Sequence, residues 1–122
     1  MRFFDDVLIY IDDLKENDRE SYRLVTSALE RLEDVGPVLR RPTVGTIEGS
    51  AFRNMRELRP RSGSRVSIRM LFVFDPKRRA VFLVAGDKAE EGQWSNWYRK
   101  AIPEADERYT AYLEAMEMEE AS

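Results

Sequence analysis

Residues 68–88 read IRMLFVFDPKRRAVFLVAGDK, and this stretch decides the fold. Val66 to Phe74 and Ala80 to Ala85 are two runs rich in β-branched and aromatic residues, which favour strands. Asp75-Pro76-Lys77 lies between them and has the residue types of a turn. Because the connection is so short, the two strands are predicted to be antiparallel neighbours. The second run is apolar throughout, which predicts burial on both faces of the sheet.

A third strand is predicted upstream, in the stretch FRNMRELRP at residues 52–60. Its Met55 to Leu58 portion resembles a strand, and Pro60 ends it because proline cannot continue a hydrogen-bonded ladder. Residues 36–52 are rich in Gly, Pro, Thr and Ser and predict no regular element.

Two helices are predicted before these strands, within residues 5–36. The first covers residues 5–16, and the second begins at a cap formed by Asn17 or Asp18 and stops at the breaker pair Gly36-Pro37. Apolar residues recur at helical spacing at Val7, Leu8, Ile11 and Leu14 in the first helix, and at Tyr22, Val25, Leu29 and Leu32 in the second. The short joint predicts an antiparallel helical hairpin packed on the sheet.

The chain ends in a helical region, predicted over residues 94–118. A helix from Trp94 to Lys100 is expected to be interrupted before Pro103. The final helix then has the apolar face Ala105, Tyr109, Tyr112, Leu113 and Met116. Trp94, Trp97 and Tyr98 have a spacing that fits burial against the sheet better than base stacking. With antiparallel strands over residues 52–86, residues 1–122 are predicted to form a single α+β domain.

Neither histidine nor cysteine occurs among the 122 residues. Their absence excludes disulfides, thiolate and imidazole metal sites, cysteine nucleophiles and serine–histidine triads. Catalysis must therefore depend on Arg, Lys, Glu, Asp or Tyr, and no metal ion or cofactor is expected. No apolar run approaches the about 20 residues of a membrane span. The start, MRFFDDVLIY, has two aspartates where a signal peptide has an apolar core, so a soluble cytoplasmic protein is predicted.

Charge is distributed unevenly along the chain. Residues 40–88 carry 12 basic and 4 acidic side chains, whereas both flanking segments are acidic and the net charge is −3. A cationic centre in an acidic protein indicates a polyanionic partner such as nucleic acid. Most of these cations are arginine, whose planar guanidinium binds phosphate and stacks on bases. The simpler alternative is that the charges only solvate a small surface.

Arginines inside the predicted strands are the strongest candidates for a site. Arg69 shares a strand face with Leu71 and Val73, and one face of the sheet is expected to meet the helices while the other carries the site. The alternation of side chains along the strand does not show which of the two faces carries the site. An arginine within a strand needs a partner, and either Glu57 or Asp87 can supply a cross-strand ion pair. Only four carboxylates face twelve cations in this region, so pairing does not account for the whole set.

Several motifs together resemble one family. They are GS-x-x-x-NMRELRP at residues 49–60, the stretch at 68–88, and W-x-x-WYRKAIPEADERY at 94–109. Over about residues 36–112 the chain resembles the phage-derived HigB-like toxins of the RelE/ParE superfamily, and the preceding helical hairpin fits the same plan. The resemblance implies a RelE-like fold, cleavage of mRNA on the ribosome, and neutralisation by a helix-turn-helix antitoxin. These toxins usually begin with a strand, and only Arg2 to Phe4 remain for it here, so that strand is either short or lost.

The resemblance implies that the basic catalytic positions are Arg56, Arg59, Arg69 and Lys88. In cleavage without a metal, the RNA 2′-hydroxyl attacks the neighbouring phosphate, which requires a proton acceptor, charge stabilisation and a proton donor. Arg59 and Arg69 are assigned to the phosphate oxygens. Lys88 either stabilises charge or, with a pKa lowered by cationic neighbours, acts as the base. Glu57 is either a base or a structural partner of the arginines.

Further cations are candidates for binding RNA outside the reaction centre: Arg53, Arg61, Arg65, Lys77, Arg78 and Arg79. The last three lie at the predicted hairpin tip, where they either solvate the turn or contact phosphate. Two other functions remain open. One is inhibition of DNA gyrase, as in ParE-type toxins. The other is noncatalytic binding of nucleic acid by a protein of phage origin.

Overall fold

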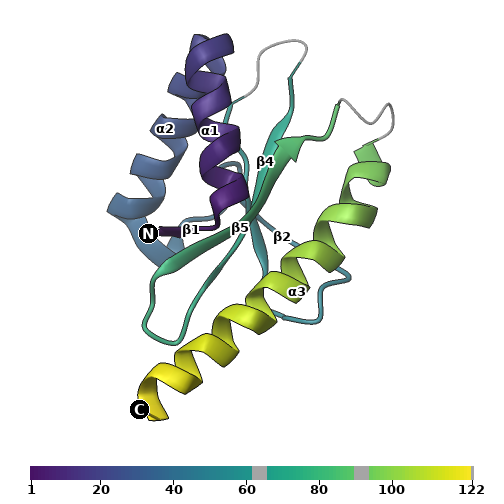
Figure 1. Ribbon diagram of the computed structural model, residues 1–122. Helices are drawn as coiled ribbons and strands as arrows, with labels where there is room; N and C mark the ends of the chain where they lie inside the picture. The colour runs from purple at the N-terminus through teal and green to yellow at the C-terminus, as the bar shows by residue number, and fades with distance from the viewer. Residues whose placement is uncertain (62–65, 90–93, 122) are drawn as a thin grey trace.

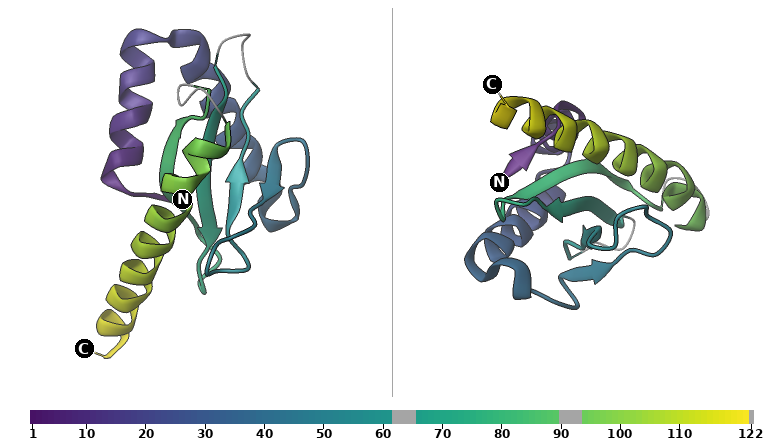
Figure 2. Two further views of the ribbon diagram at one scale, coloured as in Figure 1. Left: turned by 90° about the vertical axis from the view of Figure 1, so that its right-hand side faces the viewer. Right: turned by 90° about the horizontal axis from the view of Figure 1, so that it is seen from below.

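A computed structural model describes residues 1–61, 66–89 and 94–121 of the chain. It shows an α+β fold in which a helical hairpin, a five-stranded sheet and a long C-terminal helix form three layers (Figures 1 and 2). The elements are β1 (Arg2–Phe3), α1 (Asp5–Asn17), α2 (Arg19–Val35), a 3-10 turn η1 (Gly36–Val38), β2 (Val44–Thr46), β3 (Arg56–Leu58), β4 (Ile68–Phe74), β5 (Ala80–Asp87) and α3 (Trp94–Ala121). The predicted fold class is confirmed.

The sheet is mixed, with strand order β1-β5-β4-β3-β2. Strands β2 to β5 form the expected antiparallel meander, and β4 and β5 share the longest ladder. Strand β1 pairs parallel with β5, so the prediction of a purely antiparallel sheet is wrong at this edge. The hairpin of α1 and α2 forms the crossover from β1 to the opposite edge at β2 (Figure 1).

Both edge strands are short. The initial strand is present but reduced to Arg2–Phe3, whose partners are Val81 and Phe82. At the other edge, Val44–Thr46 pairs with β3, although residues 36–52 were predicted to be irregular. A three-residue strand containing glycine has little intrinsic β preference, and pairing with β3 determines its conformation.

The hairpin helices begin and end close to the predicted residues. Asp18 caps α2, because its carboxylate accepts hydrogen bonds from the backbone N–H and the hydroxyl of Ser21. Gly36 ends α2 with a φ of 77°, a conformation that favours glycine. Val7 and Leu14 of α1 are buried as predicted, but Leu8 is 45% exposed and does not belong to the packed stripe.

The alternation of β4 divides the core between the two faces of the sheet. Ile68, Met70 and Phe72 pack with α1 and α2, whereas Leu71 and Val73 pack with α3. Both faces are therefore covered by helices (Figure 2). The prediction that only one face of the sheet meets the helices is accordingly wrong. Arg69 lies on the side of α3.

Helix α3 is continuous from Trp94 to Ala121, and the predicted interruption before Pro103 does not occur. Proline in a helix interior costs about 3 kcal/mol because it removes a hydrogen bond and crowds the preceding turn. Here Pro103 is on the exposed side. Residues at spacings of four on the opposite side, Trp97, Ala101, Ala105 and Tyr109, are all buried against the sheet. Packing on both sides of the proline therefore offsets its local cost.

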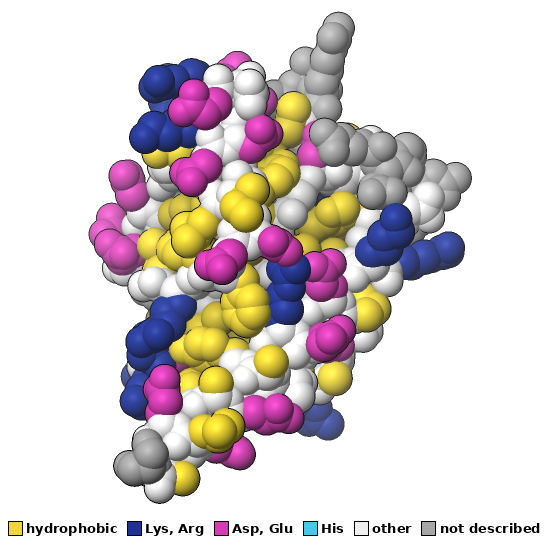
Figure 3. Space-filling view, in the orientation of Figure 1, with side chains coloured by type: hydrophobic (Ala, Val, Ile, Leu, Met, Phe, Trp, Pro, Cys, Tyr) yellow, Lys and Arg dark blue, Asp and Glu magenta, His cyan; other side chains and the backbone are white. Residues whose placement is uncertain are grey.

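The outer face of α1 is acidic, with some apolar residues among the carboxylates (Figure 3). Leu8 and Ile9 are exposed there beside Asp5, Asp12 and Asp13. Within the described parts of the chain, no helix has both the length and the apolar character needed to cross a membrane.

Candidate active site: a buried carboxylate surrounded by cations

Glu57 is the centre of a polar cluster on the α3 side of the sheet. It lies in the middle of β3 and is only 2% exposed. Its Oε1 accepts a hydrogen bond of 2.6 Å from Nε of Arg59, and its Oε2 accepts one of 2.7 Å from the hydroxyl of Tyr98. A buried carboxylate requires such partners, because an uncompensated charge in the interior is strongly unfavourable.

Arg69 approaches the same carboxylate from the neighbouring strand β4. Its Nη1 donates to the backbone carbonyl of Ile68 at 2.8 Å, and its Nε lies 3.9 Å from Oε1 of Glu57. This Nε is buried and has no hydrogen-bond partner, which is true of no other buried side-chain nitrogen or oxygen in the described residues. Buried polar atoms are nearly always satisfied, so an unsatisfied donor beside a charged cluster is a candidate for binding a ligand.

Lys88 completes the cluster from the end of β5. Its backbone N–H donates to the carbonyl of Ser67, and its Nζ lies 5.7 Å from the ring centroid of Tyr98, within cation–π range. The residue is 8% exposed. Burial lowers the pKa of Lys88, and the positive charges of Arg69 and Arg59 lower it further, while Glu57 opposes them. The amine therefore loses its proton more readily than an ordinary lysine does.

Two glycines make room for this arrangement. A Cβ on Gly45 of β2 would lie 2.6 Å from Cζ of Arg59, so the guanidinium occupies the space of a missing side chain. A Cβ on Gly86 of β5 would lie 2.5 Å from Nε1 of Trp97, which packs α3 against the sheet. Both close approaches depend on the absence of a Cβ.

The cluster combines one carboxylate with three cations and one phenol. Its excess positive charge, held in a mostly buried setting, favours an anion such as a phosphodiester. Burial raises the pKa of Tyr98, and the hydrogen bond and charge of Glu57 raise it further. The phenol therefore stays protonated and remains a hydrogen-bond donor to Glu57.

Arg56 is not brought into this cluster. It alternates with Glu57 along β3, and its Nη1 donates to the carbonyl of Pro37 at 3.2 Å, next to the end of α2. Nη1 of Arg40 donates to the same carbonyl at 2.7 Å. Burial, followed by the charge of Arg40, lowers the pKa of Arg56. Of the four basic catalytic candidates, the structure thus gathers Arg59, Arg69 and Lys88 around Glu57.

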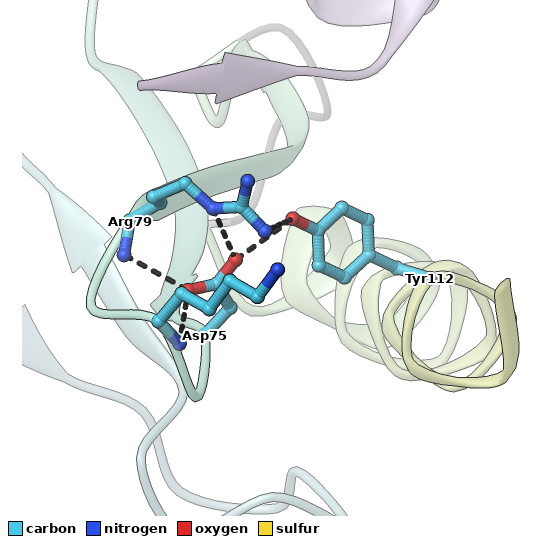
Figure 4. Close-up of polar contacts among 4 residues, drawn as sticks. Asp75, Arg79 and Tyr112 are labelled. Atoms are coloured by element: carbon cyan, nitrogen blue, oxygen red, sulfur yellow. Dashed lines mark hydrogen bonds and ion pairs between the residues drawn. The ribbon is translucent and has the colours of Figure 1, made fainter. Parts of the chain in front are cut away.

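The candidates for binding RNA outside the centre have different settings. Arg53, Arg61, Lys77 and Arg78 are exposed, and Arg65 lies outside the described residues. Arg79 is paired with Asp75, as Figure 4 shows.

Asp75 ties the β4–β5 turn to α3 (Figure 4). Its buried carboxylate accepts hydrogen bonds from the backbone N–H groups of Lys77 and Arg79, from Nε of Arg79 at 2.9 Å, and from the hydroxyl of Tyr112 at 2.8 Å. Burial alone would raise the pKa of Asp75, but the hydrogen bonds from Arg79 and Tyr112 and the charge of Arg79 outweigh it, so the pKa is lowered. Arg79 therefore helps to hold the β4–β5 turn against α3.

Tyr98 is a residue of the cluster whose helical spacing predicted only burial in the core. Trp97 is buried as predicted, and Tyr98 packs in the same cluster, but its hydroxyl also reaches Glu57. A tyrosine in a helix packed against a sheet generally needs a hydrogen-bond partner, and this was the available signal. The side chain of Trp94 lies outside what the structure describes. Asp87, the alternative partner for Arg69, accepts instead from the backbone N–H groups of Ser67 and Ala89.

The chain is similar to proteins of one known family over most of its length. The family model "Phage derived protein Gp49-like (DUF891)" matches residues 12–110. The chain belongs to this family. The matched residues include α2, the whole meander and most of α3, so every residue of the cluster around Glu57 lies within the family region of this Gp49-like protein.

Two relatives of this Gp49-like protein come from Mycobacterium tuberculosis (strain ATCC 25618 / H37Rv). This chain is 49% identical over 100 residues to "Putative toxin HigB2". The match covers 82% of this chain but only 49% of that relative. The chain is 47% identical over 95 residues to "Putative toxin HigB3", covering 78% of this chain and 79% of the relative. The resemblance to HigB-like toxins is confirmed, although the chain spans about half the length of HigB2. No solved structure matches this chain.

Proposed function

We propose that this Gp49-like protein is the toxin of a type II toxin–antitoxin system and acts as a metal-independent mRNA endoribonuclease in the cytoplasm. The observation that carries the proposal is the buried, unsatisfied Nε of Arg69 beside Glu57, Arg59 and Lys88. The cluster offers excess positive charge and a donor without an acceptor, which a phosphodiester oxygen would supply. The names of HigB2 and HigB3 support the toxin class.

The reaction begins when an RNA 2′-hydroxyl attacks the phosphate on the neighbouring 3′-oxygen of the same ribose. Arg69 donates to a nonbridging phosphate oxygen and stabilises the charge that develops there, as a preorganised donor does in other phosphoryl reactions. Arg59 contributes its positive charge while its Nε holds Glu57. Cleavage of the bond to the 5′-oxygen leaves a 2′,3′-cyclic phosphate on one fragment and a 5′-hydroxyl on the other.

Proton transfer is assigned to Lys88. A lysine whose pKa is lowered toward the working pH can accept the proton of the 2′-hydroxyl. Glu57 is the less suitable base, because each of its oxygens already accepts a hydrogen bond from Arg59 or Tyr98. Its role is to position Arg59 and Arg69. The leaving 5′-oxygen takes a proton from water.

The partners follow from this chemistry. The acid–base groups are weak, and positioning of mRNA by the ribosome supplies the orientation that such groups need, which contributes several kcal/mol to catalysis. A helix-turn-helix antitoxin neutralises the toxin.

Inducible expression followed by mapping of mRNA 5′ ends in cells tests the proposal. The native chain should arrest growth and create new 5′ ends within coding sequences, and Arg69→Ala should do neither. Arg99→Ala, which removes an exposed arginine of α3, serves as the matched control and should behave like the native chain. Growth arrest with unaltered mRNA ends and broken DNA would favour a gyrase inhibitor instead. RNA binding without new ends would favour a noncatalytic protein.

A further inference from the structure

A second cationic site lies next to the cluster, on the side of α2. An open cavity of about 140 Å³ lies between α2, the segment before β2 and the residues that follow β3. Three arginines line it: Arg31 belongs to α2, and Arg59 and Arg61 belong to the residues that follow β3. Two hydroxyl residues, Ser27 and Thr43, also belong to its wall.

Among the described residues, the lining contains no carboxylate to balance these charges. Arg31 and Arg61 are exposed, and neither makes an ion pair or hydrogen bond with another side chain in the described parts of the chain. Like charges that share a small cavity repel one another, and an anion removes that repulsion. Guanidinium groups and hydroxyls are the usual donors to phosphate oxygens.

Arg59 connects this cavity to the cluster around Glu57. Its Nε is held by Glu57 at 2.6 Å, its guanidinium lies over Gly45, and its backbone N–H donates to the carbonyl of Thr43 at 2.7 Å. Its Nη groups make no hydrogen bond within the described residues. The same residue thus belongs both to the cluster around Glu57 and to the lining of the cavity.

We infer that this cavity binds a phosphate of the RNA backbone next to the linkage that is cleaved. The inference rests on the proposed function and extends it, because it assigns Arg31, which no sequence motif indicated, and Arg61 to substrate binding. A polyanion with regularly spaced phosphates can occupy both sites at once, with Arg59 between them. The cavity therefore sets the direction in which the RNA extends from the cluster around Glu57.

Binding of a 2′-O-methyl RNA oligonucleotide, which cannot undergo internal attack, tests this site separately from catalysis. The double variant Arg31→Gln/Arg61→Gln is compared with Arg23→Gln, which removes an exposed arginine from the same helix but not from the cavity. The double variant should bind about tenfold more weakly at low salt, as expected for lost charged hydrogen bonds. Its plot of log affinity against log salt should be shallower by about 0.7, which corresponds to one phosphate on a single strand. Arg23→Gln should bind like the native chain.

The inference is overturned if the native chain does not bind the oligonucleotide, or if the double variant has the same RNA affinity and salt slope as the native chain. It is also overturned if Arg23→Gln loses as much RNA affinity as the double variant does. A fourth contrary result is a loss of antitoxin binding by the double variant while its RNA binding is unchanged. The last result would assign the cavity to acidic side chains of a protein partner. Cleavage by the native chain with unaltered binding by the double variant would refute the cavity site and leave the ribonuclease standing. Weaker RNA binding by the double variant, without any cleavage by the native chain, would support the cavity site and refute the ribonuclease.

Discussion

The hydroxyl of Tyr98 donates a 2.7 Å hydrogen bond to Oε2 of Glu57, which joins α3 to the inner part of the sheet. The other carboxylate oxygen holds Arg59, so a single buried side chain links the C-terminal helix to the cationic cluster. The position of α3 and the geometry of the candidate site therefore depend on each other.

Replacing Tyr98 with phenylalanine should weaken both stability and cleavage. The substitution leaves one oxygen of buried Glu57 without a donor, which costs about 1–3 kcal/mol of unfolding free energy. Urea unfolding measures the first effect, and cleavage of ribosome-bound mRNA measures the second. Tyr112→Phe is the matched control, because it breaks a similar bond to Asp75 away from the site and should reduce stability alone. Native-like cleavage by Tyr98→Phe would contradict the role of Glu57 in positioning the cations.

Lys88 should titrate below the ordinary lysine pKa of 10.5. Burial and the charges of Arg69 and Arg59 lower this pKa, so Arg69→Gln should raise it toward 10.5, whereas Arg99→Gln should leave it unchanged. NMR of the lysine side chain as a function of pH measures both values. Because a base acts in its deprotonated form, cleavage by the native chain should increase with pH up to the pKa of Lys88. A rate that falls over this range contradicts the assignment of Lys88 as the base.

Gly45→Ala should displace the guanidinium of Arg59 without removing its charge. The added Cβ would meet Cζ of Arg59 at 2.6 Å, and the end of a flexible side chain can move away. Since small misplacements in a reaction centre can reduce rates by up to about 100-fold, cleavage should fall while the fold is retained. A double-mutant cycle supplies the control. In an Arg59→Gln background the shorter side chain leaves room, and Gly45→Ala should then have little further effect; additive losses would argue against the contact.

Asp75→Asn should reduce stability in a pH-dependent way. The folded-state pKa of Asp75 lies below the ordinary value of 3.8, so its ionised form stabilises the fold above that value. The variant should therefore be less stable than the native chain at neutral pH, by about 2 kcal/mol for lost charged hydrogen bonds. The difference should shrink as the pH falls below 3.8 and vanish below the folded-state pKa. Unfolding free energies at several pH values test this, and a difference that grows in acid would contradict it.

Residues with strong local patterns were predicted correctly. The apolar run of β5, the turn at Asp75 and the heptad-like spacing of α2 each specify their own structure, because burial and turn geometry are encoded within a few neighbouring residues. The α+β class followed from the order of these elements. An ion pair of Arg69 with Glu57 was one of two alternatives predicted because an arginine within a strand needs a partner, and the structure brings these two together.

Features that depend on distant contacts were missed. Pro103 stays inside α3 because residues on both sides of it pack on the sheet, which the local proline rule does not include. Strand β2 exists only through its pairing with β3. Tyr98 joined the site because α3 crosses above Glu57, a relation between residues 41 positions apart. The catalytic role that the resemblance implied for Arg56 stays a prediction, and its side chain lies away from Glu57.

Cleavage of a ribosome-bound mRNA that carries a single 2′-deoxy substitution tests the central claim most directly. The native chain should cleave the unmodified mRNA at that position and leave a 2′,3′-cyclic phosphate and a 5′-hydroxyl. It should not cleave the linkage whose 2′-hydroxyl is missing, and Arg69→Gln should cleave neither. Cleavage of the substituted linkage, or native-like cleavage by Arg69→Gln, would contradict a reaction in which the cations around Glu57 promote attack by the RNA's own hydroxyl.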